Sequence, residues 1–367
     1  MSIIKVMVID DSAIVRQVLS GIINEAAGME VMDTAQDPIF ALQKLEKIKP
    51  DVITLDVEMP RMDGLTFLEK LMNENPIPVV MCSSLTQKSS DTSIKALRLG
   101  AVEIVGKPSS NMKQDLQDQR KMIVDAIRAA AHARLSKMKP PAIRQLSKLN
   151  VQKKQTADVI LPKKAILTSA PSSRLVAIGA STGGTQALEY VVSSLNLDSP
   201  GVVIVQHMPE SFTEAFARRL DSVSQVAVKE ARDGDLVEMG KVLIAPGGKH
   251  MVLENRAGKL YTLIKEGPLV SRHRPSVDVL FRSVTQTAAK QSLAIIMTGM
   301  GDDGANGMKE MFDAGVYTVA QDEDSCVIFG MPAVAIERGG VKKISSLSKI
   351  PELINAYNRP IEFKELI

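Results

Sequence analysis

Acidic side chains stand at the ends of two apolar runs in the first third of the chain. Asp10 and Asp11 follow residues 6–9, and Asp56 follows residues 52–55. The carboxyl ends of parallel strands line one crevice of an open α/β sheet, so we expect these three carboxylates to lie together. Crowded carboxylates repel unless a cation neutralises them, and Mg²⁺ suits this because it prefers oxygen ligands and bridges carboxylates to phosphate. A carboxylate beside Mg²⁺ can attack phosphorus, which predicts an aspartyl phosphate.

Two further strand ends add a cation and a hydroxyl to this pocket. Lys107 comes just after residues 102–105, and Ser83, which follows residues 79–82, could track a new phosphoryl oxygen. The alternative is that each acid only caps the helix after its strand, a common role for aspartate. Suitable groups on four separate strand ends favour the phosphorylation site.

A second set of reactive side chains lies in the other half of the chain. The apolar residues 175–178 run into Gly179-Ala180-Ser181-Thr182-Gly183-Gly184, and a helical pattern begins at Thr185. This places Ser181 in a sharp strand-to-helix turn where small neighbours allow close approach of a substrate, and helix N-terminal amides nearby could stabilise negative charge on an acyl oxygen. A phosphate-binding turn is the alternative. However, the loop has no P-loop lysine, and its spacing departs from the dinucleotide fingerprint.

A base and an acid follow two other strand-like runs of this half. His207 follows residues 201–205 in the segment Gln-His-Met-Pro, and histidine suits a general base because its side chain ordinarily titrates near neutrality. Residues 293–297 lead to Asp302 and Asp303, either of which could hold the imidazole in the productive tautomer. Spacing does not choose between the two acids. The order Ser, His, Asp differs from that of typical α/β-hydrolases, so we expect an independent version of the triad.

The pattern around these groups predicts an α/β protein with two doubly wound domains. Apolar runs alternate with helical periodicity over residues 1–135 and again over residues 174–367, with antiparallel strands expected within 227–263. Helices are expected at 13–27, 38–48, 65–73 and 114–135, and after Ser181, His207 and Gly304. Residues 136–173 are rich in lysine and proline with Asp158 as their only acid, which predicts a solvated interdomain linker.

The composition excludes several classes of protein. The 367 residues are 45% hydrophobic and 24% charged, so both domains can bury a core. A net charge of +3 and 3% aromatic residues argue against nucleic acid as the partner. Two distant cysteines, no apolar run of membrane-spanning length and no signal-peptide core lead us to expect a soluble, cytoplasmic protein that is not embedded in a membrane.

The first domain resembles a bacterial response-regulator receiver domain over residues 5 to about 135. The motifs that carry the resemblance are Asp10-Asp11, Asp56 with Met59-Pro60 and Asp63-Gly64, Ser83-Ser84 and Lys107-Pro108. The resemblance implies a flavodoxin-like (βα)5 fold and phosphorylation of Asp56 by a chemotaxis histidine kinase. It also implies Mg²⁺ held by Asp11, Asp56 and the Glu58 carbonyl, with Asp10 assisting. Ile104 departs from the aromatic switch residue of many receivers.

The second domain resembles the catalytic domain of the CheB family of chemotaxis protein-glutamate methylesterases. The matching segments are 178–184, 206–208, 245–250, 274–278 and 298–304. The resemblance implies that Asp303 completes the triad and that the Met300 amide is an oxyanion donor. Thr182, His250 and Arg274 are implied as residues of the oxyanion hole or cleft, whereas we expect His273 at the surface.

The same resemblance implies a substrate and a form of regulation. The substrate would be a glutamate γ-methyl ester on the cytoplasmic helices of methyl-accepting chemoreceptors, with deamidation of particular glutamines as a second activity and no cofactor for the ester reaction. The unphosphorylated receiver would cover the cleft. Two alternatives remain. The first is an output domain that binds a partner or nucleotide without hydrolysis. The second is a DNA-binding regulator, although the sequence shows no recognition-helix module.

Overall fold

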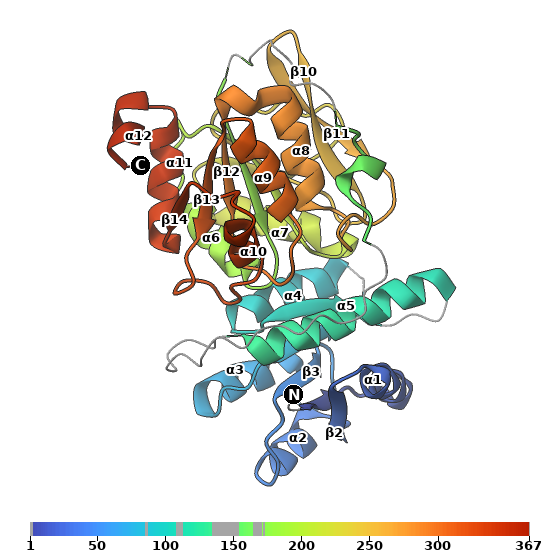
Figure 1. Cartoon of the computed structure of the whole chain (residues 1–367). Coiled ribbons are helices and arrows are strands. Elements are labelled where there is room, and N and C mark those ends of the chain that lie inside the picture. The colour runs from blue at the N-terminus through green and yellow to red at the C-terminus, as the bar shows by residue number, and fades with distance from the viewer. Residues whose placement is uncertain are drawn as a thin grey trace. The chain divides into compact units, whose positions relative to one another are not determined.

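The computed structural model describes residues 3–84, 87–107, 113–133, 154–163, 171 and 173–366. The chain divides into two compact units, Met1–Ser136 and Lys137–Ile367 (Figure 1). Each unit is an α/β structure built on a parallel sheet, as the alternation of apolar runs and helical patterns predicts. Among the described residues, no helix combines the length and apolar character needed to cross a bilayer.

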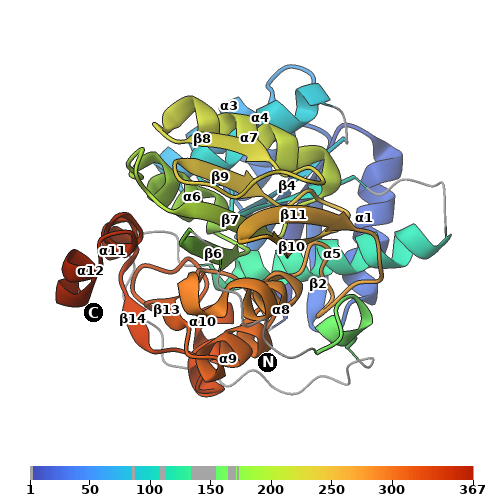
Figure 2. The same ribbon diagram turned by 90° about the horizontal axis from the view of Figure 1, so that it is seen from above.

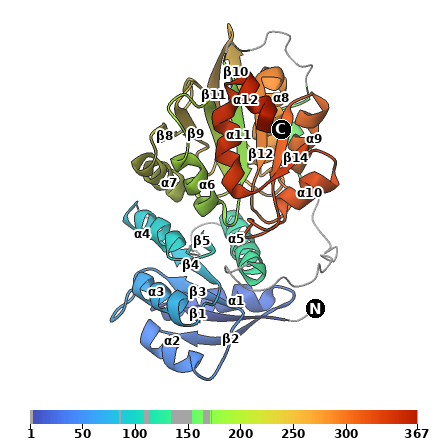
Figure 3. The same ribbon diagram turned by 90° about the vertical axis from the view of Figure 1, so that its left-hand side faces the viewer.

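The first unit contains a five-stranded parallel sheet in the order β2-β1-β3-β4-β5. Its strands are β1 (Ile4–Ile9), β2 (Met29–Ala35), β3 (Val52–Asp56), β4 (Val79–Ser83) and β5 (Glu103–Gly106). Its helices are α1 (Ala13–Glu25), α2 (Pro38–Leu45), α3 (Gly64–Glu74), α4 (Gln87–Arg98) and α5 (Lys113–His132). Helices α1 and α5 cover one face, and α2, α3 and α4 cover the other (Figure 3).

Local sequence explains where several of these helices begin. The side chains of Ser12, Asp37 and Asp63 cap α1, α2 and α3 by accepting backbone N–H groups of the first turn. Asp10, Asp11 and Asp56 precede these caps along the chain. The alternative reading, in which the strand-end acids are themselves the helix caps, is wrong for these three residues.

The second unit contains a seven-stranded parallel sheet in the order β14-β13-β12-β6-β7-β9-β8. Its strands are β6 (Leu175–Ala180), β7 (Gly201–Gln206), β8 (Ala227–Glu230), β9 (Lys241–Ile244), β12 (Ser292–Ile296), β13 (Tyr317–Gln321) and β14 (Lys343–Ser345). The expected antiparallel strands are β10 (His250–Arg256) and β11 (Lys259–Lys265), which form a separate two-stranded hairpin (Figure 2). Strand β8 lies in the same expected region but pairs in parallel with β9.

Helices cover both faces of this second sheet. They are α6 (Gly184–Ser193), α7 (Glu210–Val223), α8 (Val277–Ala288), α9 (Ala305–Asp313), α10 (Met331–Glu337), α11 (Ile350–Tyr357) and α12 (Pro360–Leu366). Short 3₁₀ turns occupy Ala157–Val159, Ala289–Gln291 and Leu347–Lys349. Helices α6, α7 and α11 lie on one face, and α8, α9 and α10 on the other (Figure 3). Every residue of β6 and β7 is buried, as expected for central parallel strands.

The sequence pattern did not indicate several elements, among them β2, α4, β14 and the helices α8, α10, α11 and α12. Strand β2 is an edge strand whose middle residues are only partly buried, so it lacks an apolar run. Helix α4 has a predominantly polar sequence, and β14 is a three-residue edge strand. Edge position and a polar sequence leave these elements without a continuous apolar run, although α4 buries Ile94 and Leu97.

The expected linker, residues 136–173, lies largely outside the described residues. Its longest described portion, residues 154–163, does not match a solvated tether. It includes a 3₁₀ turn in which Ala157 is 3% exposed, and it packs on the second unit.

Candidate phosphorylation and catalytic sites

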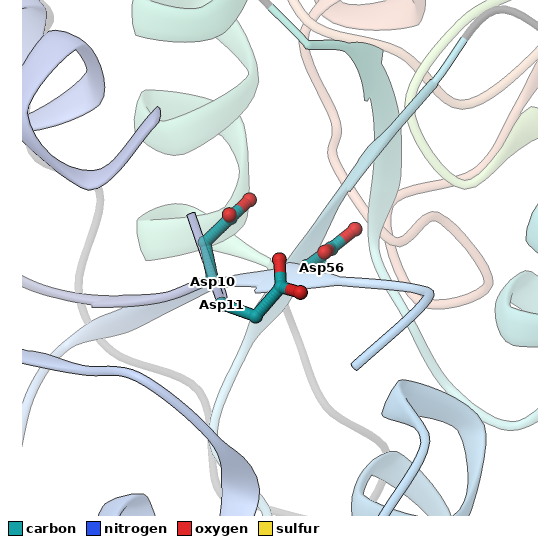
Figure 4. A group of neighbouring side chains, drawn as sticks. All are labelled: Asp10, Asp11 and Asp56. Carbon is teal, nitrogen blue, oxygen red and sulfur yellow. The ribbon is translucent and has the colours of Figure 1, made fainter. Parts of the chain in front are cut away.

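The first unit gathers three carboxylates at the carboxyl ends of β1 and β3. One oxygen from each of Asp10, Asp11 and Asp56 lies within 4.8 Å of the others (Figure 4). Asp10 and Asp56 are buried and Asp11 is exposed at the rim. An all-oxygen donor set with an open side fits Mg²⁺, which keeps part of its water shell while protein carboxylates hold it.

Lys107 lies within ion-pair distance of two of these acids. Its Nζ is 2.9 Å from Asp10 Oδ2 and 2.8 Å from Asp56 Oδ2. Burial raises the pKa of Asp56 to about 6, although the hydrogen bond and the charge of Lys107 oppose this shift. For Lys107, burial would lower the pKa, but the bonds to Asp56 and Asp10 outweigh it and raise the pKa. The ammonium therefore stays charged beside the carboxylates.

The remaining predicted residues of this pocket lie around Asp56. Ser83 ends β4 and is fully buried, and its hydroxyl donates to the Ser84 carbonyl at 3.4 Å. Glu58 is exposed, two residues beyond Asp56. Gly64 is needed for close approach, because a Cβ there would lie 2.1 Å from the Asp56 carbonyl oxygen. Ile104 is buried within β5, where it pairs with Met81.

Ser181 lies where β6 turns into α6. Its amide donates to the Thr298 carbonyl at 3.0 Å, and its carbonyl accepts from the Gly184 amide at 2.6 Å. Gly183 has a φ of +78°, a backbone conformation that glycine adopts without strain. A Cβ at Gly299 would lie 2.7 Å from Ser181 Cβ, so only glycine lets the loop after β12 pass this close. The residues that follow β6 and those that follow β12 thus fix the position of Ser181 together.

The strand register brings His207 beside Ser181. Ala180 pairs with Gln206 in the parallel β6–β7 ladder, and Ser181 and His207 are the next residues on the two strands. The His207 amide also donates to the Ala180 carbonyl at 3.1 Å. The Gln206 side chain donates to the carbonyls of both Ser181 and His207, at 2.9 and 3.1 Å. No sequence pattern indicated a role for Gln206, although it stands next to His207 in a matching segment.

Asp303, rather than Asp302, contacts the imidazole. Asp303 Oδ2 lies 2.8 Å from His207 Nε2. Asp302 instead forms ion pairs with Lys154 and Arg338. With Nε2 bonded to the carboxylate, His207 Nδ1 is the nitrogen left for a hydroxyl proton. It is buried and has no hydrogen-bond partner in the described part of the chain.

Asp303 is held by donors from the start of helix α8. It accepts from the Ser276 hydroxyl at 2.8 Å and from the amides of Val277 and Asp278 at 2.7 and 3.1 Å. Burial would raise the pKa of Asp303, but the bond to His207 and these donors outweigh burial and lower the pKa. The carboxylate is therefore ionised despite being 1% exposed.

A second acid lies close to Asp303. Asp278 is buried and accepts from the Ser271 hydroxyl at 3.0 Å and from the Gly307 amide at 2.8 Å. Burial, followed by the charge of Asp303, raises the pKa of Asp278. Two buried acids thus have opposite shifts, and the one that contacts the imidazole keeps its charge.

The residues expected in the oxyanion hole and cleft take different positions. The Met300 amide donates to no acceptor among the described residues, which leaves it available to an oxyanion. Thr182 is buried, and its carbonyl accepts from the Thr298 hydroxyl at 3.0 Å. Arg274 is exposed and donates to the Gly267 carbonyl at 2.6 Å.

His250, expected in the cleft, is a buried residue. Its side chain is 0% exposed, and its Nε2 contacts the Pro268 carbonyl at 2.9 Å. Burial lowers its pKa, so the ring is neutral. His250 thereby supports the loop that begins at Gly267.

His273, in contrast, contacts His207 directly. Its ring stacks on His207 with the ring centroids 3.6 Å apart and the planes 8° from parallel. It is half-buried, not at the surface as we expected. No pattern around His273 signals this contact, since the two histidines come from separate loops. A hydroxyl, an imidazole with a free nitrogen and an ionised carboxylate at one sheet edge can perform acyl transfer through a covalent intermediate.

Comparison with known proteins identifies the families of both domains. The CheB methylesterase family matches residues 176–354, and the response regulator receiver domain family matches residues 6–118. Protein-glutamate methylesterase/protein-glutamine glutaminase 3 of Geobacter metallireducens is 53% identical over 95% of this chain and 97% of its own length. Enzyme 1 of the same name from Pseudomonas savastanoi pv. phaseolicola is 54% identical over 96% of this chain and 98% of its own length. Enzyme 2 of that name from Chromobacterium violaceum is 53% identical over 96% of this chain and 99% of its own length. The chain belongs to the CheB family of protein-glutamate methylesterases with a receiver domain.

Proposed function

We propose that this chain is a phosphorylation-activated hydrolase that demethylates glutamate γ-methyl esters on chemoreceptors. The observation that carries the proposal is the Asp303–His207 pair beside the strand-end Ser181. The names of its relatives, which agree over nearly the full chain, support the same substrate. They also support a second activity, deamidation of receptor glutamines to glutamate.

The first half of the reaction forms an acyl-enzyme. Ser181 Oγ attacks the ester carbonyl while His207 Nδ1 takes the hydroxyl proton, and Asp303 keeps the proton on Nε2 and stabilises the imidazolium. Negative charge on the carbonyl oxygen is met by the Met300 amide. The imidazolium then gives its proton to the departing methoxide, which leaves as methanol.

The second half returns the enzyme to its starting state. His207 removes a proton from water, the hydroxide attacks the acyl-enzyme, and Ser181 recovers its proton as glutamate is released. The same steps convert glutamine, with ammonia in place of methanol. An amide is the harder bond to cleave, because its leaving group must be protonated before it departs.

The receiver domain would set the activity. Asp56 is the phosphorylation site, with a histidine kinase as donor, and Asp10, Asp11, Asp56 and the Glu58 carbonyl are the residues that would hold Mg²⁺. That cation would neutralise the crowded carboxylates and the incoming phosphoryl group. Lys107 pairs with the new phosphate, and the Ser83 hydroxyl follows one of its oxygens. Because Ile104 is aliphatic, the aromatic part of the usual switch is absent.

We further propose that the unphosphorylated receiver covers the hydrolase cleft and that phosphorylation of Asp56 weakens this docking. A closed state populated at about 99% limits activation by release to about a hundredfold. Both partners, the kinase and the cytoplasmic helices of the receptor, place the enzyme in the cytoplasm.

Methanol release from methylated receptors tests the function. Wild-type chain should release methanol, and a small-molecule phosphodonor with Mg²⁺ should raise the rate. Ser181→Ala should still bind the receptor but release no methanol. If wild type binds the receptor without releasing methanol, the chain is a binding module and the hydrolase proposal fails.

A further inference from the structure

Residues 154–163, which we call the strap, pack against the catalytic unit ahead of β6. The strap contains the 3₁₀ turn Ala157–Val159. Ala157 is 3% exposed and joins a buried apolar cluster with Val252, Val270 and Val279. Ile160 lies against Gly267, where a Cβ would come within 2.2 Å of Ile160 Cδ1. Side chains of the strap therefore fill space between the β10–β11 hairpin, helix α8 and the loop 267–274.

Polar contacts fix the same segment to helix α8. Arg282, whose side chain is 6% exposed, pairs with Asp158 at 2.9 Å and donates to the Leu161 carbonyl at 3.2 Å. The Gln286 side chain donates to the Pro162 carbonyl at 2.9 Å. Because these bonds use backbone carbonyls of the strap as well as a side chain, they fix the conformation of the strap backbone.

The strap also holds the loop that carries His273. The Gln155 carbonyl accepts from the Ser271 amide at 3.0 Å. Ser271 and Arg272 have φ values of +48° and +75°, a region that non-glycine residues occupy only when their surroundings hold them there. Val270 and His273 close this turn with reciprocal backbone bonds of 2.8 and 3.1 Å. The turn thereby presents the His273 ring to His207.

Two further contacts link the strap to the acid of the triad. Lys154 pairs with Asp302, the neighbour of Asp303 and a residue 148 positions further along the chain. Ser271, held by Gln155, donates its hydroxyl to Asp278, whose amide in turn donates to Asp303. The strap is thus connected to His207 through the turn that carries His273. It is connected to Asp303 through Asp302 and through Asp278.

We propose that the strap is a positioning segment for the esterase reaction, which clamps the loop 267–274 and so holds His273 on His207 and supports Asp303. The proposal rests on the proposed function, since positioning is measured through that reaction. Strap residues touch neither substrate nor the reacting atoms. Their release shifts the imidazole, and a shift of about 1 Å in a catalytic group costs up to about a hundredfold in rate.

A matched pair of full-length variants tests the proposal. Ala157→Glu places a carboxylate in the apolar cluster and should expel the strap. Val159→Glu makes the same change two residues away, at a side chain that is 50% exposed, and should leave the strap in place. We expect kcat for methanol release to fall at least about tenfold in the first variant and to stay at the wild-type value in the second.

Hydrogen exchange and histidine NMR report on the mechanism of that loss. The chain has four histidines, so the signals of His207 and His273 can be assigned. Ala157→Glu should speed exchange in residues 154–163 and at the Ser271 amide, and should shift both imidazole signals as the stack opens. A loss of stability alone would not shift these signals in the folded protein.

The proposal is overturned by an unchanged kcat and unchanged imidazole signals in Ala157→Glu, or by exchange in the strap that stays at the wild-type rate. If Ala157→Glu does not fold, Ile160→Ala with Val159→Ala as its control carries the test, and equal kcat in the two would overturn the proposal. If wild type releases no methanol, the proposed function fails, and the imidazole signals still decide whether the strap positions His273.

Discussion

Two aspartates at the carboxyl ends of parallel strands show how the surroundings of one carboxylate decide its chemistry. Asp56 ends β3 of the receiver, and its Oδ1 accepts the Val57 amide while its Oδ2 faces Lys107. Asp303 follows β12 of the catalytic unit and accepts from a hydroxyl, two amides and His207. Both are almost fully buried, yet their pKa values move in opposite directions.

The difference lies in how many donors each carboxylate receives. Burial raises the pKa of Asp56 because few fixed donors compensate for lost water. Asp303 is bonded on both oxygens, which keeps it charged and prevents it from turning. A carboxylate that must attack phosphorus and bind a cation needs free lone pairs, whereas one that orients an imidazole needs none.

The largest expected effect comes from the same substitution at both acids. Asp303→Asn should lower kcat by about 10⁴, because an amide at this position favours the wrong tautomer of His207. Asp56→Asn should keep the basal rate and lose only the stimulation by phosphodonor. Methanol release with and without phosphodonor measures both. Similar losses of basal rate in the two variants would contradict the division of roles.

The next effect concerns the close approach at the nucleophile. Gly299→Ala would place a methyl group 2.7 Å from Ser181 Cβ and 2.5 Å from Met331 Sδ. We expect Ser181 to move and kcat to fall by about a hundredfold, with phosphorylation of Asp56 unaffected. Gly301→Ala is the control, because no atom lies within 4 Å of a Cβ there, although its φ of +92° adds backbone strain. An equal loss in both variants would point to strain instead of contact.

The raised pKa of Asp56 predicts how Mg²⁺ binding depends on pH. The shift from 3.8 to about 6 favours the protonated folded form, so Asp56 stabilises the metal-free receiver at low pH, and this contribution is lost as the pH rises from about 4 through about 6. Mg²⁺ requires the ionised form, so its affinity should fall about tenfold between pH 7 and pH 5. Calorimetric titration measures this. The dependence should shrink in Asp56→Asn, and an affinity that is constant over this range in wild type would contradict the shift.

The smallest expected effect distinguishes the loss of a hydrogen-bond donor to Asp303 from the loss of a helix cap. Ser276→Ala removes one donor to Asp303 and the cap of α8, and should lower kcat several-fold and stability by about 1 kcal/mol. Ser12→Ala removes the equivalent cap of α1 in the receiver. It should cost its own domain a similar free energy of unfolding without changing basal kcat. Thermal unfolding and methanol release together measure the two effects.

Local sequence patterns were sufficient to predict most of the fold and the main groups of both sites. Apolar runs locate the central strands, and strand ends in a parallel sheet converge, so Asp10, Asp56, Ser181 and His207 could be assigned to two edges. The edge strand β2 and the helix α4 were missed because the first is only partly buried along its middle and the second has a predominantly polar sequence.

Other features depend on contacts between distant residues. The choice of Asp303 over Asp302 follows from the direction in which each side chain leaves the loop, and spacing carries no such information. The stack of His273 on His207 and the packing of Ala157 arise from loops that only the folded chain brings together. A lysine-rich and proline-containing composition indicated a tether, whereas Ala157 and Ile160 provide the apolar contacts of the strap.

The central claim, that Ser181 carries the acyl group, is tested most directly by acid quenching during the first turnover on methylated receptor, followed by mass spectrometry of the digested chain. The account predicts a receptor glutamyl ester on the peptide that contains Ser181, and neither adduct nor methanol release in Ser181→Ala. A glutamyl adduct on another side chain, or methanol release by Ser181→Ala at the wild-type rate, would contradict it.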